Sequence, residues 1–399
     1  MSLDLTKVVA QVGSMVARLR DGHVERQKRL QRALDIAGDE AIDLEDLKKK
    51  IASSKTTWLV ADLVEAIANH YGAPPTPAEF SVIATDGSHI DVDRHKSTRC
   101  YLINIGAVVL HYGAEPGADL DSFPRLYAED EELVIAPTTA KGRGQAVEGT
   151  LLGIKRAVEE CCKLAELASG QPPGSASLAL LDGSLILWGL EAYPEFVTEA
   201  LLDRSFIKCL EEVRKLNRDR KVALASYISF PRSTDVVNVL RVAICPHQPA
   251  DCDRFCPPGK NRDCDEVAGV QDRELFLNLL APGERSALFG SPSKVVKEHY
   301  GEHRVYFFYL RVDDEIARVE MPGWAAEDKD LLELAHALVL DQCRRGQGYP
   351  VALSEAHEQA VVTAADKEEF WQLVESLCLE EKIPTLTSAK SFSKRTRWV

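Results

Sequence analysis

The sequence predicts an α/β fold, in which strands alternate with helices through the middle of the chain. Short apolar segments at residues 80–85 and 178–181 each run into an Asp-Gly-Ser turn, which is typical of buried strands that end at the edge of a sheet. Between them, residues 145–167 carry apolar side chains every three or four positions. This spacing indicates a helix that packs on the sheet.

The composition is that of a folded, acidic protein. The 399 residues include 48 basic and 62 acidic side chains, a net charge of −14, and 45% of the residues are hydrophobic, which excludes a wholly disordered chain. No apolar run reaches the roughly 18 residues of a membrane span. The first residues also lack the apolar run of a secretory signal. We therefore expect a cytoplasmic protein without a membrane partner.

Residues 1–77 are predicted to form an N-terminal helical region. Apolar residues between Val8 and Leu19 recur at helical spacing, and a second helical segment at 44–70 ends before the proline-rich turn at 72–77. An amphipathic helix needs a surface to cover its apolar face. This region therefore either packs on the main domain or contacts a partner or a second copy of the chain.

Strands and helices continue to alternate after residue 77. Further strands are predicted at 100–110, 222–229, 304–311 and 316–320, the last two as a hairpin around Asp313 and Asp314. Further helices are predicted at 197–216, from 233 to 240, and from a capping box at Asp366 to Glu369. A basic tail, either solvated or in contact with a phosphate backbone, comprises Lys382, Lys390, Lys394, Arg395 and Arg397.

Asp86 and Asp182 are candidate metal ligands because each directly follows an apolar strand. On adjacent strands the two carboxylates would lie side by side and repel, unless a divalent cation lies between them or one is protonated. Oxygen ligands favour Mg²⁺ or Mn²⁺ over zinc. We choose Glu148, near the start of the 145–167 helix, as the third carboxylate. The alternatives on the same helix are Glu159, Glu160 and Glu166.

His357 is a further candidate. Ser354 reads as a helix N-cap, which would place His357 in the first helical turn. Imidazole suits Mn²⁺ better than Mg²⁺. A role in metal or phosphate chemistry therefore stands beside a purely structural one.

Four of the ten cysteines fall within one short segment, at Cys245, Cys252, Cys256 and Cys264. This segment is rich in Pro, Asp and Gly and has too few apolar residues to fold by burial alone. We therefore predict a metal-binding insertion at about 245–275, with zinc as the first choice, a four-cysteine iron–sulfur cluster as the second and free thiols as the third. Without a secretion signal, the others are predicted to be core thiols rather than disulfide partners: Cys100, Cys161, Cys162, Cys209, Cys343 and Cys378.

Four phrases of the sequence, in this order, resemble those of the NurA nucleases: IATDGS at 83–88, LLDGSL at 180–185, SYISFPR at 226–232, and the stretch from GYP at 348–350 to the Ala-His pair at 356–357. The resemblance spans roughly residues 50–399. It implies an RNase H-like mixed central sheet flanked by helices, and a homodimer. It also implies Mn²⁺-dependent cutting of DNA together with a hexameric HerA-type ATPase, in the resection of DNA ends at double-strand breaks.

The resemblance also implies roles for single residues. The strand-end aspartates of the family fall on Asp86 and Asp182, and its late tyrosine and histidine on Tyr349 and His357. The helix glutamate maps onto Glu148 if the loop at 170–174 is an insertion. In this assignment Asp86, Asp182, Glu148 and His357 hold Mn²⁺ or Mg²⁺, and Tyr349 positions the scissile phosphate.

The resemblance divides the chain into the N-terminal region, 1–77, and a nuclease domain, 78–399. Two other functions remain open from the residues. One is a structure-specific RNase H-like nuclease. The other is a non-catalytic scaffold that recruits the ATPase.

Overall fold

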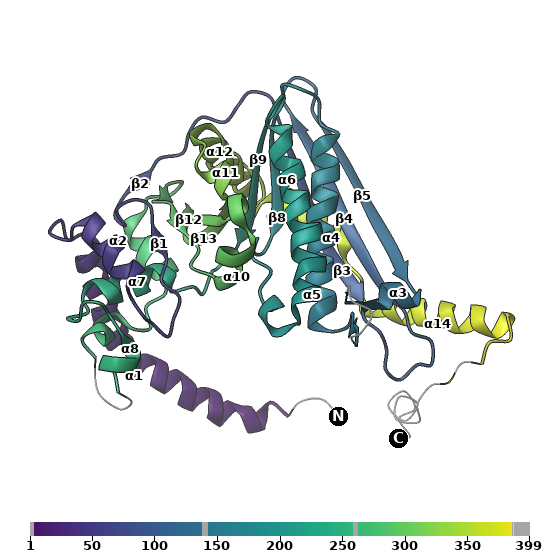
Figure 1. The fold of residues 1–399 in the computed structure, drawn as a ribbon, viewed down its shortest axis with the longest axis horizontal. Helices are drawn as coiled ribbons and strands as arrows, with labels where there is room; N and C mark the ends of the chain where they lie inside the picture. The colour runs from purple at the N-terminus through teal and green to yellow at the C-terminus, as the bar shows by residue number, and fades with distance from the viewer. Residues whose placement is uncertain (1–3, 138–142, 258–261, 385, 387–399) are drawn as a thin grey trace. The chain divides into compact units, whose positions relative to one another are not determined.

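The computed structural model describes residues 4–137, 143–257, 262–384 and 386 (Figure 1). The chain divides into two compact units. Unit 1 comprises Met1–Ala73, Ser229–Ser293 and Tyr306–Val319. Unit 2 comprises Pro74–Ile228, Lys294–Val305 and Glu320–Val399. None of the described helices is long and apolar enough to cross a membrane.

Unit 2 is built on a mixed sheet with the strand order β9-β8-β3-β4-β5 (Figure 1). Strands β3, β4 and β5 are antiparallel neighbours, whereas β8 runs parallel to both β3 and β9. This is the RNase H-like arrangement, so the predicted α/β class and mixed sheet are confirmed. The strands are β3 (Phe80–Ile90), β4 (Tyr101–Tyr112), β5 (Gly117–Tyr127), β8 (Ala176–Asp182) and β9 (Lys221–Ile228).

Helices cover both faces of this sheet. Asp86 on β3 pairs with Gly106 on β4, so both residues project to the same face, where helix α13 (Val351–Ala360) lies. Gly87, the next residue of β3, faces the opposite side, where helix α4 (Thr150–Ser169) lies. Helix α6 (Ile207–Leu216) packs beside α4, and together with the sheet they enclose a core that includes Ile83, Leu164 and Leu210.

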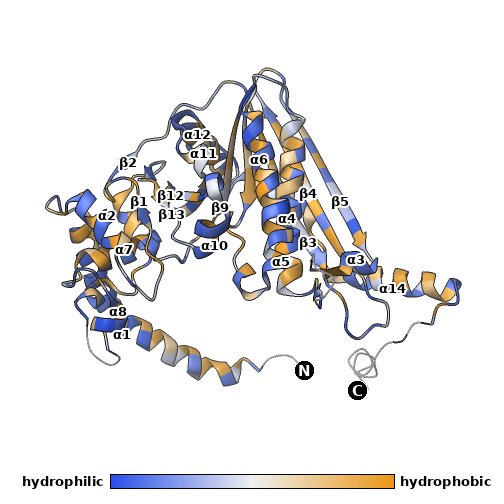
Figure 2. Ribbon diagram, viewed as in Figure 1, coloured by the Kyte–Doolittle hydropathy of each residue, from blue (hydrophilic) through white to orange (hydrophobic). Residues whose placement is uncertain are grey.

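Further elements of unit 2 lie around this sheet. They are α3 (Asp130–Leu133), β6 (Val134–Ile135), β7 (Gln145–Ala146), η1 (Leu190–Ala192), α5 (Glu195–Thr198), η2 (Glu199–Phe206), α10 (Lys294–His299), η4 (Gly301–His303), α11 (Gly323–Ala326), α12 (Lys329–Arg345) and α14 (Ala364–Glu380). The predicted helix at 197–216 corresponds to the continuous run of α5, η2 and α6. The sequence analysis did not predict strand β5. This strand lies at the edge of the sheet, most of its residues are exposed and it is largely hydrophilic, so it lacks the apolar pattern of a buried strand (Figure 2).

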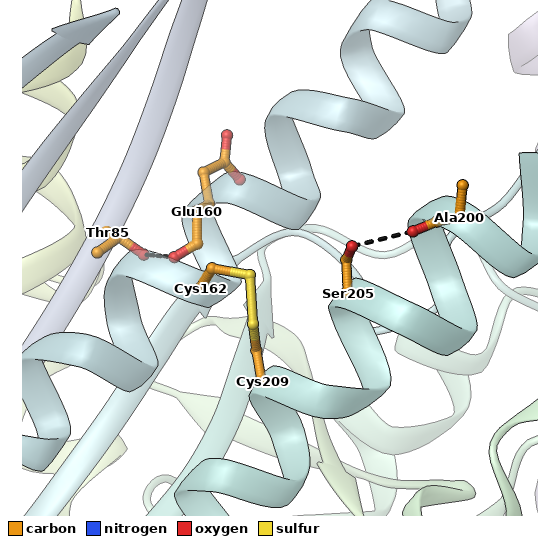
Figure 3. The surroundings of a disulfide bond; sticks show 6 residues. All are labelled: Thr85, Glu160, Cys162, Ala200, Ser205 and Cys209. Atoms are coloured by element: carbon orange, nitrogen blue, oxygen red, sulfur yellow. Dashed lines mark hydrogen bonds between the residues drawn. A yellow bond between two sulfur atoms is a disulfide. The ribbon is translucent and has the colours of Figure 1, made fainter. Parts of the chain in front are cut away.

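Cys162 on α4 and Cys209 on α6 form a disulfide, with their Cα atoms 5.2 Å apart (Figure 3). The prediction that these two residues are core thiols is therefore wrong. They are 47 residues apart in the sequence, and only the packing of the two helices brings them together. The other cysteines predicted as core thiols form no disulfide among the described residues: Cys100, Cys161 and Cys343 are buried, and Cys378 is half-buried.

Unit 1 combines helices with short strands around its own core. Strands β12 (Val305–Val312) and β13 (Glu315–Pro322), which lie mainly in this unit, form the predicted hairpin around Asp313. The other elements are α1 (Thr6–Ala37), α2 (Leu44–Ala52), β1 (Asp62–Leu63), β2 (His70–Tyr71), α7 (Asp235–Ala243), α8 (Cys252–Phe255), η3 (Asp263–Val267), α9 (Asp272–Leu279), β10 (Arg285–Ser286) and β11 (Phe289–Gly290).

The N-terminal residues do not form a unit of their own. The core of unit 1 joins Ile36 and Leu47 to Val239 and Phe276, so residues before 73 pack with residues 229–293. The predicted helix at 44–70 is wrong beyond Ala52. There β1 and β2 pair with β11 and β10, so that tertiary strand pairing overrides the helical spacing.

Three helices begin at other residues than predicted. Helix α4 begins at Thr150 rather than 145, and α13 begins at Val351, directly after Pro350. Helix α14 begins after Thr363, whose side chain forms the capping box with Asp366. Within the predicted basic tail, Lys382 follows α14, whereas Lys390, Lys394, Arg395 and Arg397 lie outside the described residues.

We expect Gly106→Ala to lower the free energy of unfolding by about 1–3 kcal/mol, the usual cost of overpacking. A Cβ at this position would lie 2.2 Å from the carbonyl oxygen of Ala356 and 2.4 Å from the amide nitrogen of Ala360, so α13 would have to move. Chemical denaturation measures the effect. Gly153→Ala in α4 is the control, because its Cβ meets nothing within 4 Å, and we expect it to stabilise by about 0.5–1 kcal/mol. Equal effects of the two substitutions would contradict this packing.

Candidate active site

Asp86 and Asp182 lie side by side on neighbouring parallel strands. The pairing of β3 with β8 runs from Ser81 and Ser177 to Thr85 and Leu181, so the two aspartates are the next residues in register. Both side chains therefore project to the α13 face of the sheet. Strand β8 ends at Asp182, but β3 continues to Ile90 because β4 remains paired with it. The predicted end of a strand at Asp86 is thus corrected, while the predicted juxtaposition of the two carboxylates is present.

His357 and Tyr349 reach these aspartates from the α13 side. Nδ1 of His357 lies 2.7 Å from Oδ2 of Asp86, and the hydroxyl of Tyr349 donates a hydrogen bond to the Asp182 carboxylate. The Tyr349 ring packs edge-on against Tyr227 of β9, with 5.5 Å between the ring centroids. Burial and the neighbouring negative charge of Asp182 raise the pKa of the Tyr349 hydroxyl. The phenol is therefore held as a neutral donor.

The position of His357 in its helix differs from the prediction. Ser354 is not the N-cap, because α13 begins at Val351, and His357 falls in the last turn rather than the first. The His357 side chain is 64% exposed, whereas that of Asp86 is 15% exposed. His357 is thus the solvent-facing member of the pair and is open to a substrate.

Of the glutamates weighed in the sequence analysis, Glu160 on α4 is the one whose pKa is raised by the charges of Asp86 and Asp182, and it contacts β3 from the α4 face. Glu148 precedes the first residue of α4 and is exposed in the loop. Glu160 is 7% exposed, and its Oε1 lies where Gly87 leaves room on β3, since a Cβ there would be only 2.5 Å away. The close contact of Thr85 with the carbonyl of Glu160 holds the helix against the strand, at 3.0 Å (Figure 3).

Burial and charge act on the pKa values of the carboxylates at this site. Burial raises the pKa of Glu160 to about 8, and the charges of Asp86 and Asp182 add to this rise, whereas Arg156 opposes it. The Arg156 Nε atom lies 2.9 Å from Glu160 Oε1, but this contact lacks hydrogen-bond geometry, so the buried Oε1 accepts no hydrogen bond from the described residues. Burial also raises the pKa of Asp182, despite the hydrogen bond from Tyr349. The carboxylates are thus short of positive charge.

A second buried carboxylate holds the loop that follows Asp182. Oε2 of Glu320 accepts hydrogen bonds from Ser184 Oγ at 2.8 Å and from the Leu185 amide at 2.9 Å. The Tyr300 hydroxyl donates to the Leu185 carbonyl at 2.9 Å. The sequence analysis did not identify Glu320 as a residue near the site. Its only sequence signal is that it is an acidic residue at the end of the predicted strand at 316–320.

The side chains in this part of unit 2 are of the types that bind divalent cations. Asp86, Asp182 and Glu160 carry carboxylate oxygens and His357 carries an imidazole, donors that suit Mn²⁺ or Mg²⁺. A cation there would offset the repulsion that raises the carboxylate pKa values, and it would satisfy the Glu160 oxygen. Among the residues that the structure describes, no three such side chains already converge on one point as ligands. Binding would therefore require side-chain rotation.

Comparison with known protein families gives one finding. A family model described as the NurA domain matches residues 80–362, a range that contains Asp86, Glu160, Asp182, Tyr349 and His357. No curated protein matches the chain significantly.

Proposed function

The chain belongs to the NurA family of nucleases, and from this premise we propose that it is a metal-dependent deoxyribonuclease that hydrolyses phosphodiester bonds. The observation that carries the proposal is the placement of Asp86 and Asp182 in register on parallel strands, within electrostatic range of the buried Glu160. Such a cluster is costly to keep in a fold unless it holds a cation.

Each residue has a distinct task in this proposal. Asp86, Asp182 and Glu160 hold Mn²⁺, or Mg²⁺ in its place. When bound, the metal supplies an activated water and stabilises the leaving oxygen. His357 orients the Asp86 carboxylate through its 2.7 Å contact and faces the substrate. Tyr349 positions the scissile phosphate in this proposal; its single hydroxyl proton, donated to Asp182 in the metal-free protein, would turn from that carboxylate to the phosphate when the substrate binds.

We further propose that the protein works in the cytoplasm as a homodimer with a HerA-type hexameric ATPase, and that it resects DNA ends at double-strand breaks. In this role it cuts ends as an exonuclease and single strands as an endonuclease. The net charge of −14 supports dependence on a partner, because an acidic protein has little non-specific affinity for DNA. Helix α1 supplies a surface for protein contacts, since its residues Val9, Val16 and Leu19 are more than half exposed (Figure 2).

The test is cleavage of end-labelled linear duplex and of circular single-stranded DNA, with and without the ATPase. We expect shortening from the ends in Mn²⁺ and none in EDTA. A branched junction substrate distinguishes this activity from that of a structure-specific nuclease, which would cut the junction and leave blunt ends intact. Absence of cleavage by the folded protein with its ATPase would contradict the nuclease and favour the scaffold.

A further inference from the structure

The four clustered cysteines come together in unit 1 from three separate pieces of chain. Cys245 directly follows α7, and its amide donates to the Val242 carbonyl at 3.2 Å. Cys252 begins α8 and Cys256 directly follows it, one helical turn apart, with the Cys256 amide 3.1 Å from the Cys252 carbonyl. Cys264 lies in η3. The spacing in the sequence alone did not fix this arrangement of the backbone.

These cysteines surround one pocket. Cys245, Cys256 and Cys264 line a pocket of about 130 Å³. Cys252 adjoins it, since its thiol is in hydrogen-bond contact with that of Cys256 and within electrostatic range of Cys264. All four thiols are free, whereas Cys162 and Cys209 are joined.

The segment around the pocket has little else to hold it folded. Among its described residues between 245 and 264, the buried apolar side chains are those of Ala250 and Cys264, and Phe255 is 37% exposed. Its attachment to the rest of unit 1 includes two backbone hydrogen bonds to Lys55, at 2.8 and 2.9 Å. A segment with so small a core is usually held by a cross-link or a metal.

Two positive side chains attach to this segment. Nη2 of Arg241 lies 3.7 Å from the Cys264 sulfur, and Nζ of Lys50 lies 2.6 Å from the Cys245 carbonyl oxygen. The imidazole of His247 instead stacks on the ring of Phe255, with the centroids 4.0 Å apart, so we do not count it as a ligand.

We propose that Cys245, Cys252, Cys256 and Cys264 bind one structural Zn²⁺ ion that folds this segment of unit 1. Four thiolates complete the tetrahedral shell that structural zinc prefers. No three of the described side chains converge on a single point, so at least two rotate about their Cα–Cβ bonds on binding. The site is independent of the proposed nuclease activity.

The test is the metal content of the full-length protein, purified without a metal-affinity tag and measured by mass spectrometry of the elements. We expect about one zinc per chain, released when a mercurial reagent blocks the thiols. Cys256→Ser should lose it, because Cys256 lines the pocket and is only partly buried. Cys378→Ser, which alters a free cysteine outside the cluster, should keep it.

The wild-type measurement keeps the proposal falsifiable if Cys256→Ser does not fold. Zinc well below one per chain in the folded wild-type protein would overturn it. Iron accompanied by sulfide would overturn it in favour of a cluster. Zinc that survives in Cys256→Ser and resists release by the mercurial would also overturn it, because the ion would then lie elsewhere.

Discussion

Replacing Asp86 by asparagine is expected to lower the rate of metal-dependent DNA cleavage by at least about 10³-fold, equivalent to about 4 kcal/mol of lost transition-state stabilisation. The amide keeps the shape of the side chain but removes the negative charge that would hold a divalent cation. It also weakens the contact with His357, which lies 2.7 Å from the carboxylate. Initial rates on end-labelled duplex in saturating Mn²⁺ measure the loss.

Asp119→Asn is the matched control for this prediction. Asp119 lies on β5 of the same sheet, its side chain is 83% exposed, and its contact with His111 is 3.7 Å long. The substitution removes the same charge from the surface, so we expect the cleavage rate to stay within about twofold, as for most surface changes. Equal losses in the two variants, or a fully active Asp86→Asn protein, would contradict the assignment of Asp86.

The sequence was sufficient to predict the strands that carry the aspartates. An apolar run ending in Asp-Gly is readable because burial demands apolar residues and the turn demands glycine. That the two aspartates share a register follows once β3 and β8 pair. The contacts of His357 and Tyr349 with them were not readable, since they depend on how α13 packs over Gly106, about 250 residues earlier in the chain.

The third carboxylate shows a different limit of sequence reasoning. Among the glutamates of α4, Glu160 lies four residues before the buried Leu164 and so shares its face, and this phase was available from the sequence. The choice of Glu148 followed from a helix start placed at 145. The structure instead puts Glu148 outside the helix, beyond Gly149 with its positive φ of 56°. An error of five residues at a helix end was thus enough to exchange a buried residue for an exposed one.

The cysteines show that long-range contacts decide chemistry. Cys162 and Cys209 looked like isolated core residues because nothing local marks either of them. Their pairing arises from the crossing of α4 and α6, which brings the two sulfur atoms together (Figure 3). A pattern of local spacing carries no record of such a crossing.

Glu160→Gln is expected to abolish metal-dependent cleavage, by at least about 10³-fold, and at the same time to stabilise the metal-free protein. The pKa of Glu160 is about 8 in the folded protein, above its ordinary value of 4.5, so ionised Glu160 destabilises the fold. This destabilisation grows as the pH rises from about 4.5 to 8, and glutamine removes it. Denaturation in EDTA at pH 5 and pH 8 should therefore show a gain for the variant that is larger at pH 8.

Glu148→Gln is the matched control, because it makes the same chemical change at the exposed position before α4. We expect it to alter neither the cleavage rate nor the dependence of stability on pH. Mn²⁺ should raise the thermal midpoint of the wild-type protein and of Glu148→Gln at pH 8, but not that of Glu160→Gln. Activity and metal-free stability thus move in opposite directions only at the residue that holds the cation. If Glu148→Gln lost cleavage while Glu160→Gln kept it, the third metal ligand would have to be reassigned from Glu160 to Glu148.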